Sequence, residues 1–147
     1  MKRLLLLILS VIMSTNIMSQ SISAKERQQC KQMYIQAAKE MNQQMPIAID
    51  EYTTLFSVTF MNWVFSYNYR INFDCSSVSK DDFKELLSNI KKEAIIDQRK
   101  IIDSGRYGAT RSEMKRLFKA LGFKFRYNYI DINGIFMGSF EYDYSVF

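Results

Sequence analysis

The first 24 residues limit how much of this chain can fold and in which compartment it does so. Lys2 and Arg3 precede an almost uninterrupted apolar run, 4–13, and small polar residues follow as far as Ala24. This order is typical of a cleaved export signal. The run is short for a bilayer span, so an uncleaved membrane anchor is the less favoured alternative. We predict a signal peptide at 1–24 and a periplasmic or secreted protein.

The remaining length suits one domain. Removing 24 residues from 147 leaves 123, enough for a single hydrophobic core, and we predict one domain over 25–147. The chain is 48% hydrophobic and 14% aromatic, as expected for a globular protein. Its formal charge of +5 falls to +3 without Lys2 and Arg3, which is too little to indicate nucleic acid as a partner. We expect no stable membrane insertion after cleavage.

Two cysteines, Cys30 and Cys75, lie in the part of the chain that follows the leader. In an oxidising compartment an even pair most simply forms a disulfide, and we predict one between them. The alternative is a reactive or metal-binding thiol. It lacks support because neither cysteine has a CxxC neighbour and the chain contains no histidine. We predict no metal and no cofactor.

Three segments have the periodicity of amphipathic helices. The first covers 25–45 and ends at Pro46, the only proline of the chain. The second begins with a serine cap and covers Ser79 to about Asp103. The third, Thr110–Gly122, opens with a capping box and closes with a glycine that can terminate a helix.

Alternating aromatic and polar residues predict strands between and after these helices. The runs 55–60 and 63–73 are the first pair, and a Tyr-x-Tyr occurs in the second of them and again after residue 126. With the helices they give the order α-β-β-α-α-β-β. This order predicts an α+β domain with an antiparallel sheet and the helices packed on one face.

The final hairpin can be predicted in register. Asn133-Gly134 is the sequence of a two-residue hairpin turn. With that turn, opposite charges pair on one face of the hairpin and aromatic residues pair on the other, whereas we expect a three-residue loop with a bulge to shift both sets. The expected pairs are Arg126–Glu141, Lys124–Asp143, Phe125–Tyr142 and Tyr127–Phe140. We expect the apolar tail, 142–147, to dock as an edge strand or to pair with another chain.

A resemblance accompanies these patterns. Residues 45–55, Met-Pro-Ile-Ala-Ile-Asp-Glu-Tyr-Thr-Thr-Leu, resemble a [LM]-P-x3-D-x2-T-x-L signature of small exported bacterial proteins of unknown function. In that group Tyr-x-Tyr strands and a late Y-x-Y-x-D-x-x-G segment follow, and the chain matches the latter at 127–134. The resemblance implies export and the fold and says little of activity. Cysteines that the group carries late in the chain are absent here.

The sequence offers few routes to catalysis. Without histidine, Ser-His-Asp and Cys-His systems are excluded, and no GxSxG or phosphate-binding glycine loop is present. Paired carboxylates are the remaining route, as in a carboxylate-only hydrolase. No acidic pair is favoured, because Asp50 and Glu51 are adjacent and Asp131 precedes a turn. We therefore predict no catalytic residues.

Two features are candidates for partner binding. Residues 91–119 carry nine basic and four acidic side chains, whereas the rest of the chain beyond the leader has a net charge of −2. Aromatic residues on the sheet could also contact a partner. The favoured explanations are simpler: a solvated helix face for the basic segment and a buried core for the aromatic residues. The candidate residues are Arg106, Tyr107, Arg111, Lys115, Trp63, Tyr67 and Tyr127.

These observations leave three hypotheses. The first is a non-catalytic binding protein of the bacterial envelope that acts as an inhibitor or immunity-type partner of another protein. The second is a periplasmic accessory factor for a secretion or pilus assembly machine. The third and least favoured is the hydrolase. The expected partner is another envelope or secreted protein, or an anionic envelope polymer.

Overall fold

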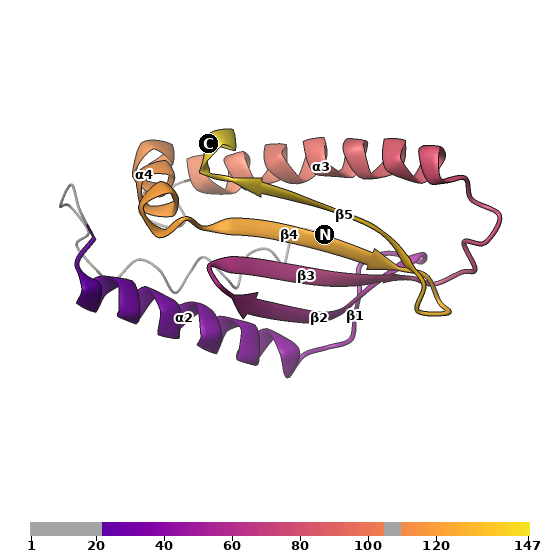
Figure 1. Ribbon diagram of the computed structural model, residues 1–147, viewed down its shortest axis with the longest axis horizontal. Helices are drawn as coiled ribbons and strands as arrows, with labels where there is room; N and C mark the ends of the chain where they lie inside the picture. The colour runs from indigo at the N-terminus through magenta and orange to yellow at the C-terminus, as the bar shows by residue number, and fades with distance from the viewer. Residues whose placement is uncertain (1–21, 105–109) are drawn as a thin grey trace.

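The computed structural model describes residues 22–104 and 110–147, and within them three α-helices lie beside a five-stranded sheet (Figure 1). The helices are α2 (Ala24–Asn42), α3 (Lys80–Asp103) and α4 (Arg111–Leu121). The strands are β1 (Ile47–Ala48), β2 (Thr53–Met61), β3 (Val64–Ile71), β4 (Lys124–Ile130) and β5 (Phe136–Asp143), and the 3-10 helix η2 (Tyr144–Val146) follows β5. The predicted α+β class is confirmed, and the two-residue β1 is an addition to the predicted order.

The sheet is mixed, so the predicted antiparallel sheet is wrong. Its strand order is β1-β2-β3-β4-β5, and β3 pairs with β4 in parallel while the other neighbours are antiparallel. The chain leaves β3, passes through α3 and α4, and starts β4 beside the start of β3. The local patterns indicate each hairpin separately and carry no information on how two hairpins join, which is why the prediction failed.

The two central strands carry the same pattern, Phe-x-Tyr-Asn-Tyr, at 65–69 and 125–129, and pair it in register. Like residues therefore meet across the parallel ladder: Tyr67 stacks on Tyr127 with ring centres 5.0 Å apart. On the opposite face the two asparagine side chains are joined by a 2.8 Å hydrogen bond. The matched pairs are Phe65–Phe125, Tyr67–Tyr127, Asn68–Asn128 and Tyr69–Tyr129.

The helices pack on the aromatic face of this sheet, as predicted. Each helix contributes a ring that contacts one of the face's aromatic residues, at centroid distances between 5.6 and 6.4 Å. The ring contacts are Tyr34–Phe65 from α2, Phe83–Tyr129 from α3 and Phe118–Phe125 from α4. Figure 1 shows α2 lying along β2 and α3 along β5. Gly138 of β5 allows α3 to pack closely on that strand, because a Cβ there would lie 2.7 Å from Leu87 Cδ1 of α3.

The helix boundaries follow the predicted caps. Ser79 Oγ accepts a hydrogen bond from the Asp82 N–H at 3.1 Å, at the start of α3. Thr110 and Glu113 form the predicted capping box of α4. Gly122 ends that helix with a φ of 67°, a left-handed conformation that favours glycine. These signals are local, so the sequence shows them without knowledge of the tertiary fold.

The final hairpin has the predicted register but not the predicted turn. The Asp131 N–H donates to the Ile135 carbonyl at 2.9 Å and the Gly134 N–H to the Asp131 carbonyl at 3.0 Å, so three residues, 132–134, form the loop. The ladder then skips Met137, an extra residue on β5. The longer loop and the bulge cancel, and the register beyond them is the predicted one. The confirmed pairs are Lys124–Asp143, Phe125–Tyr142, Arg126–Glu141 and Tyr127–Phe140.

The structure does not support the predicted disulfide, because Cys30 and Cys75 are free, buried thiols. Cys30 lies one helical turn after Arg27, whose guanidinium carbon is 4.7 Å from the ring centre of Trp63, at the turn between β2 and β3. Cys75 follows the opposite end of β3, which is about 20 Å away at strand spacing. A disulfide requires Cα atoms within about 7 Å. Burial raises the pKa of both thiols, which makes them poor nucleophiles at neutral pH.

The separation of the two thiols predicts independent effects on stability. Cys30→Ala and Cys75→Ala should each lower the free energy of unfolding by about 1 kcal/mol, and the double variant should show their sum within roughly 0.5 kcal/mol. Urea denaturation with and without reductant measures this. Loss of stability on reduction, or a double variant no worse than either single one, would contradict the free-thiol structure.

Candidate partner-binding surfaces

The predicted basic residues that fall in the described part of the chain are held by internal contacts. Arg106 and Tyr107 lie outside the described residues. The Arg111 guanidinium donates two hydrogen bonds to the Asp103 carboxylate and so ties the start of α4 to the end of α3. Lys115 Nζ donates to the main-chain oxygen of Phe147 at 3.0 Å.

The tail that Lys115 contacts is docked on the protein, but only its first two residues belong to the edge strand β5, and the expected strand does not continue beyond Asp143. After β5 the chain forms η2, and the Phe147 ring lies 5.5 Å from that of Phe118 in α4. Arg99 Nε donates to the Val146 carbonyl, and Lys119 Nζ lies 5.8 Å from the ring centre of Tyr144. Part of the charge between 91 and 119 therefore serves to fasten the C-terminal segment.

The predicted aromatic residues divide into one at a turn and two in the core. Trp63 occupies the β2–β3 turn with a φ of +64°, which is unusual for a residue other than glycine. Arg27 of α2 lies over its ring and donates hydrogen bonds to the Ala120 and Leu121 carbonyls, so Arg27 joins α2 to the β2–β3 turn and to the end of α4. Tyr67 and Tyr127 are only 3% and 4% exposed.

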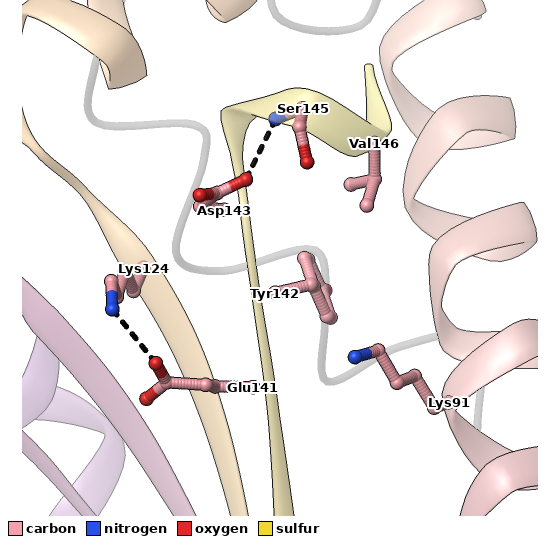
Figure 2. A pocket seen from close by; sticks show the side chains of 7 residues that line it. All are labelled: Lys91, Lys124, Glu141, Tyr142, Asp143, Ser145 and Val146. Carbon is pink, nitrogen blue, oxygen red and sulfur yellow. Dashed lines mark hydrogen bonds and ion pairs between the residues drawn. The ribbon is translucent and has the colours of Figure 1, made fainter.

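A recess of about 200 Å³ lies at the end of β5, on the side of α3. Figure 2 shows Lys91 entering from α3 and Lys124 from β4, on the two sides of the last strand. The lining residues are Lys91, Lys124, Glu141, Tyr142, Asp143, Ser145 and Val146. Sequence reasoning missed this recess, although the predicted pairing of β4 with β5 already placed Lys124 opposite Asp143, another of its lining residues.

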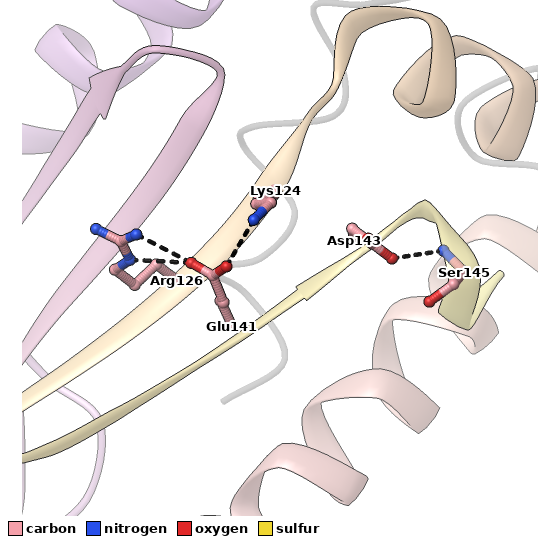
Figure 3. Close-up of polar contacts among 5 residues, drawn as sticks. All are labelled: Lys124, Arg126, Glu141, Asp143 and Ser145. Carbon is pink, nitrogen blue, oxygen red and sulfur yellow. Dashed lines mark hydrogen bonds and ion pairs between the residues drawn. The ribbon is translucent and has the colours of Figure 1, made fainter.

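Ionic hydrogen bonds organise the recess. Glu141 accepts from Lys124 Nζ at 2.8 Å and from Arg126 at 3.0 and 3.2 Å (Figure 3), and these bonds, that of Lys124 first, lower the pKa of the Glu141 carboxyl. Asp143 accepts from the Ser145 N–H at 2.8 Å, which lowers its pKa. Two cations thus hold Glu141 ionised, and a main-chain N–H does the same for Asp143.

The same direction holds at the other carboxyl groups whose pKa is displaced. At each of them a hydrogen bond lowers the pKa. The donor is Arg111 for Asp103, and a serine or threonine at a helix cap or turn for the others. These groups are Glu26, Asp74, Asp103 and Glu113. A glycosidase-type acid needs a raised pKa, so these four and the two of the recess suit acceptors and ion-pair partners rather than proton donors. Within 22–104 and 110–147, no three His, Cys, Asp or Glu side chains lie together as a metal site would require.

The comparisons with known proteins give a fold and no family. No family model matches the chain, and no curated protein matches it. Its structure is similar to that of a Pseudomonas aeruginosa protein assigned as secreted (PA3611), with a TM-score of 0.55 and 13% identity over 86% of this chain and 98% of the other. It is also similar to EpsS, the pilotin of the Vibrio vulnificus type 2 secretion system, with a TM-score of 0.57 and 12% identity over 84% of this chain and 96% of the other. At these identities the likeness shows a shared fold.

The helices give no sign of a membrane span. Across the part of the chain that the structure describes, none combines the length and the apolar content that crossing a bilayer requires.

The contacts of Glu141 predict a pH dependence of stability. The pKa of the Glu141 carboxyl is lower in the folded than in the unfolded protein. Its contribution to the free energy of unfolding is therefore fully present at a pH above the ordinary carboxyl pKa, and is lost as the pH falls through the folded pKa. Glu141→Gln should cost at most about 1 kcal/mol at pH 7, since the ion pairs are partly exposed, and this difference should vanish in acid. Urea titrations at pH 7, 5 and 3 measure it. A difference that stays constant or grows toward pH 3 would contradict the assigned role, and Asp81→Asn serves as the control.

Proposed function

We propose that the protein is an exported, non-catalytic accessory factor of the bacterial envelope that binds a component of a secretion machine. The observation that carries the proposal is the likeness of its fold to a type 2 secretion pilotin over most of both chains. The fold alone does not determine function, so the proposal needs support from the chain itself.

One property of the chain and one of its structural neighbours agree with an accessory role outside the cytoplasm. Its first residues have the order of an export signal, and a secretion accessory must reach the envelope to act. The second similar structure, of a protein assigned as secreted, has the same fold over nearly its whole length. Both support the periplasm or the exterior as the site of action.

The chemistry of the recess favours binding over catalysis. Its carboxylates are held ionised by Lys124, Arg126 and the Ser145 N–H. Ser145 has no histidine base anywhere in the chain, and a serine without a base is a weak nucleophile. Paired charges of this kind form a polar surface patch, which is typical of the rim of a protein interface.

The inhibitor or immunity-type role stays a prediction that the same experiment can test. Both roles require a protein partner, but they differ in what happens to it. An accessory factor promotes assembly of a multimeric envelope component, whereas an inhibitor binds a soluble enzyme or toxin and lowers its activity. The identity and state of the captured partner therefore distinguish the two.

The test is crosslinking in the envelope of the source bacterium combined with deletion of the gene. We expect the tagged protein to capture a subunit of an outer-membrane secretion channel, and deletion to reduce the assembled channel several-fold. The full chain should restore assembly, while a chain lacking residues 2–21 should not, because it stays in the cytoplasm. Unchanged assembly, together with capture of a soluble enzyme that loses activity, would contradict the proposal and favour the inhibitor.

A further inference from the structure

Three loops that are far apart in the sequence meet at one end of the sheet. They are the β1–β2 loop at 49–53, the segment 72–76 after β3, and the β4–β5 loop at 131–135. The parallel pairing of β3 with β4 places the ends of both strands side by side, with Arg70 opposite Ile130. Hydrogen bonds join the loops: the Asn72 N–H donates to the Tyr52 carbonyl at 2.8 Å, and the Ile132 N–H donates to the Phe73 carbonyl at 3.4 Å.

Large apolar side chains are exposed where these loops meet. Tyr52 is 57% exposed and Phe73 44%, and their rings lie 6.2 Å apart. In the third loop and the start of β5, Ile132, Ile135 and Phe136 are 52%, 56% and 63% exposed. Single exposed apolar residues are normal, but a contiguous group on one end of a protein marks an interaction surface.

The three loops carry charge of one sign, and the nearest cations in the chain, the exposed Arg70 at the end of β3 and Lys80 at the start of α3, flank them. The segments 47–54, 72–79 and 130–138 contain four carboxylates and no lysine or arginine. Asp131 is 1% exposed, and its Oδ1 accepts from the Asn133 and Ile135 N–H groups while its Oδ2 has no hydrogen-bond partner among the described residues. A buried carboxylate oxygen without a partner is costly, so it adds to the attraction for a cation. We call the surface formed by 50–53, 73–76 and 131–136 the acidic tip.

We propose that the acidic tip binds a cationic segment of another protein, in which lysine or arginine side chains alternate with large apolar ones. The apolar side chains cover Tyr52, Phe73 and Ile135, and the cations face the surrounding carboxylates. An anionic polymer or an anionic membrane surface is repelled by the carboxylates of these loops, so a cationic protein segment is the better match. The inference depends only on the tip, so it stands or fails independently of the proposed role in secretion.

Both motifs of the sequence resemblance contribute to this surface. The segment 45–55 supplies the first loop and 127–134 supplies most of the third. Their acidic residues, Asp50 and Asp131, also shape the loops, since Asp50 Oδ1 accepts from the Tyr52 N–H at 2.9 Å. Glu51 is exposed, lies between Asp50 and Tyr52, and is the carboxylate best suited to a test.

The test measures binding of defined peptides to the whole protein by fluorescence anisotropy and by amide chemical shifts. The probe alternates lysine with leucine, and the two control peptides replace lysine by glutamate or leucine by serine. We expect the probe to bind at least tenfold more tightly than either control, with shifts concentrated in the acidic tip. Equal binding of the glutamate peptide, no binding of the probe, or shifts centred elsewhere would overturn the proposal.

Matched variants locate the contact. Ile135→Ser should weaken binding roughly fivefold through lost apolar contact. Met61→Ser, at a residue that is 70% exposed at the other end of the sheet, should leave binding unchanged. Glu51→Lys should weaken binding about threefold at low salt, and the difference should disappear at high salt. Equal losses for Ile135→Ser and Met61→Ser would contradict the proposal, as would self-association through the tip, which would identify a second copy of the chain as its occupant.

Discussion

The in-register parallel pairing of β3 with β4 is the constraint on which the rest of the structure depends. Each strand carries Phe-x-Tyr-Asn-Tyr, and pairing them without an offset stacks rings on one face and joins two asparagine amides on the other. A shift of one residue would bring aromatic side chains to the polar face and polar ones to the core. The burial of these rings therefore sets both the register and the face that the helices cover.

This pairing also sets the two ends of the molecule apart. Because β3 and β4 run in the same direction, both start near Trp63 and the end of α4, and both end at the acidic tip. Cations at the first end hold the C-terminal segment and form the ion pairs of Glu141. Carboxylates and exposed apolar side chains gather at the second. A protein with two ends of different chemistry can contact two different surfaces, which suits an accessory role.

The sequence predicts the local features of this fold well. The caps of α3 and α4 and the pairing of Arg126 with Glu141 depend on residues close together in the chain, and the structure confirms them. The turn of the last hairpin was predicted wrongly although its register was right, because two local irregularities cancel. Even so, the error shows that a correct register does not establish the turn.

The features that depend on distant residues were not predictable in the same way. The antiparallel sheet and the Cys30–Cys75 disulfide both assumed how distant segments meet. The sheet is mixed instead, and the two cysteines lie toward opposite ends of β3. One signal was present in the chain, since Phe-x-Tyr-Asn-Tyr occurs at 65–69 and again at 125–129. The acidic tip could not be recognised because its three loops are brought together only by the sheet.

The most direct test of this account is the measurement of interstrand nuclear Overhauser effects between β3 and β4 in the protein in solution. The structure predicts contacts between Tyr67 and Tyr127 and between Asn68 and Asn128, in the pattern of a parallel ladder. Contacts that run in opposite directions along the two strands, or none between 64–71 and 124–130, would contradict the in-register parallel pairing of β3 with β4. In that case neither the helix-covered face nor the acidic tip would exist as described.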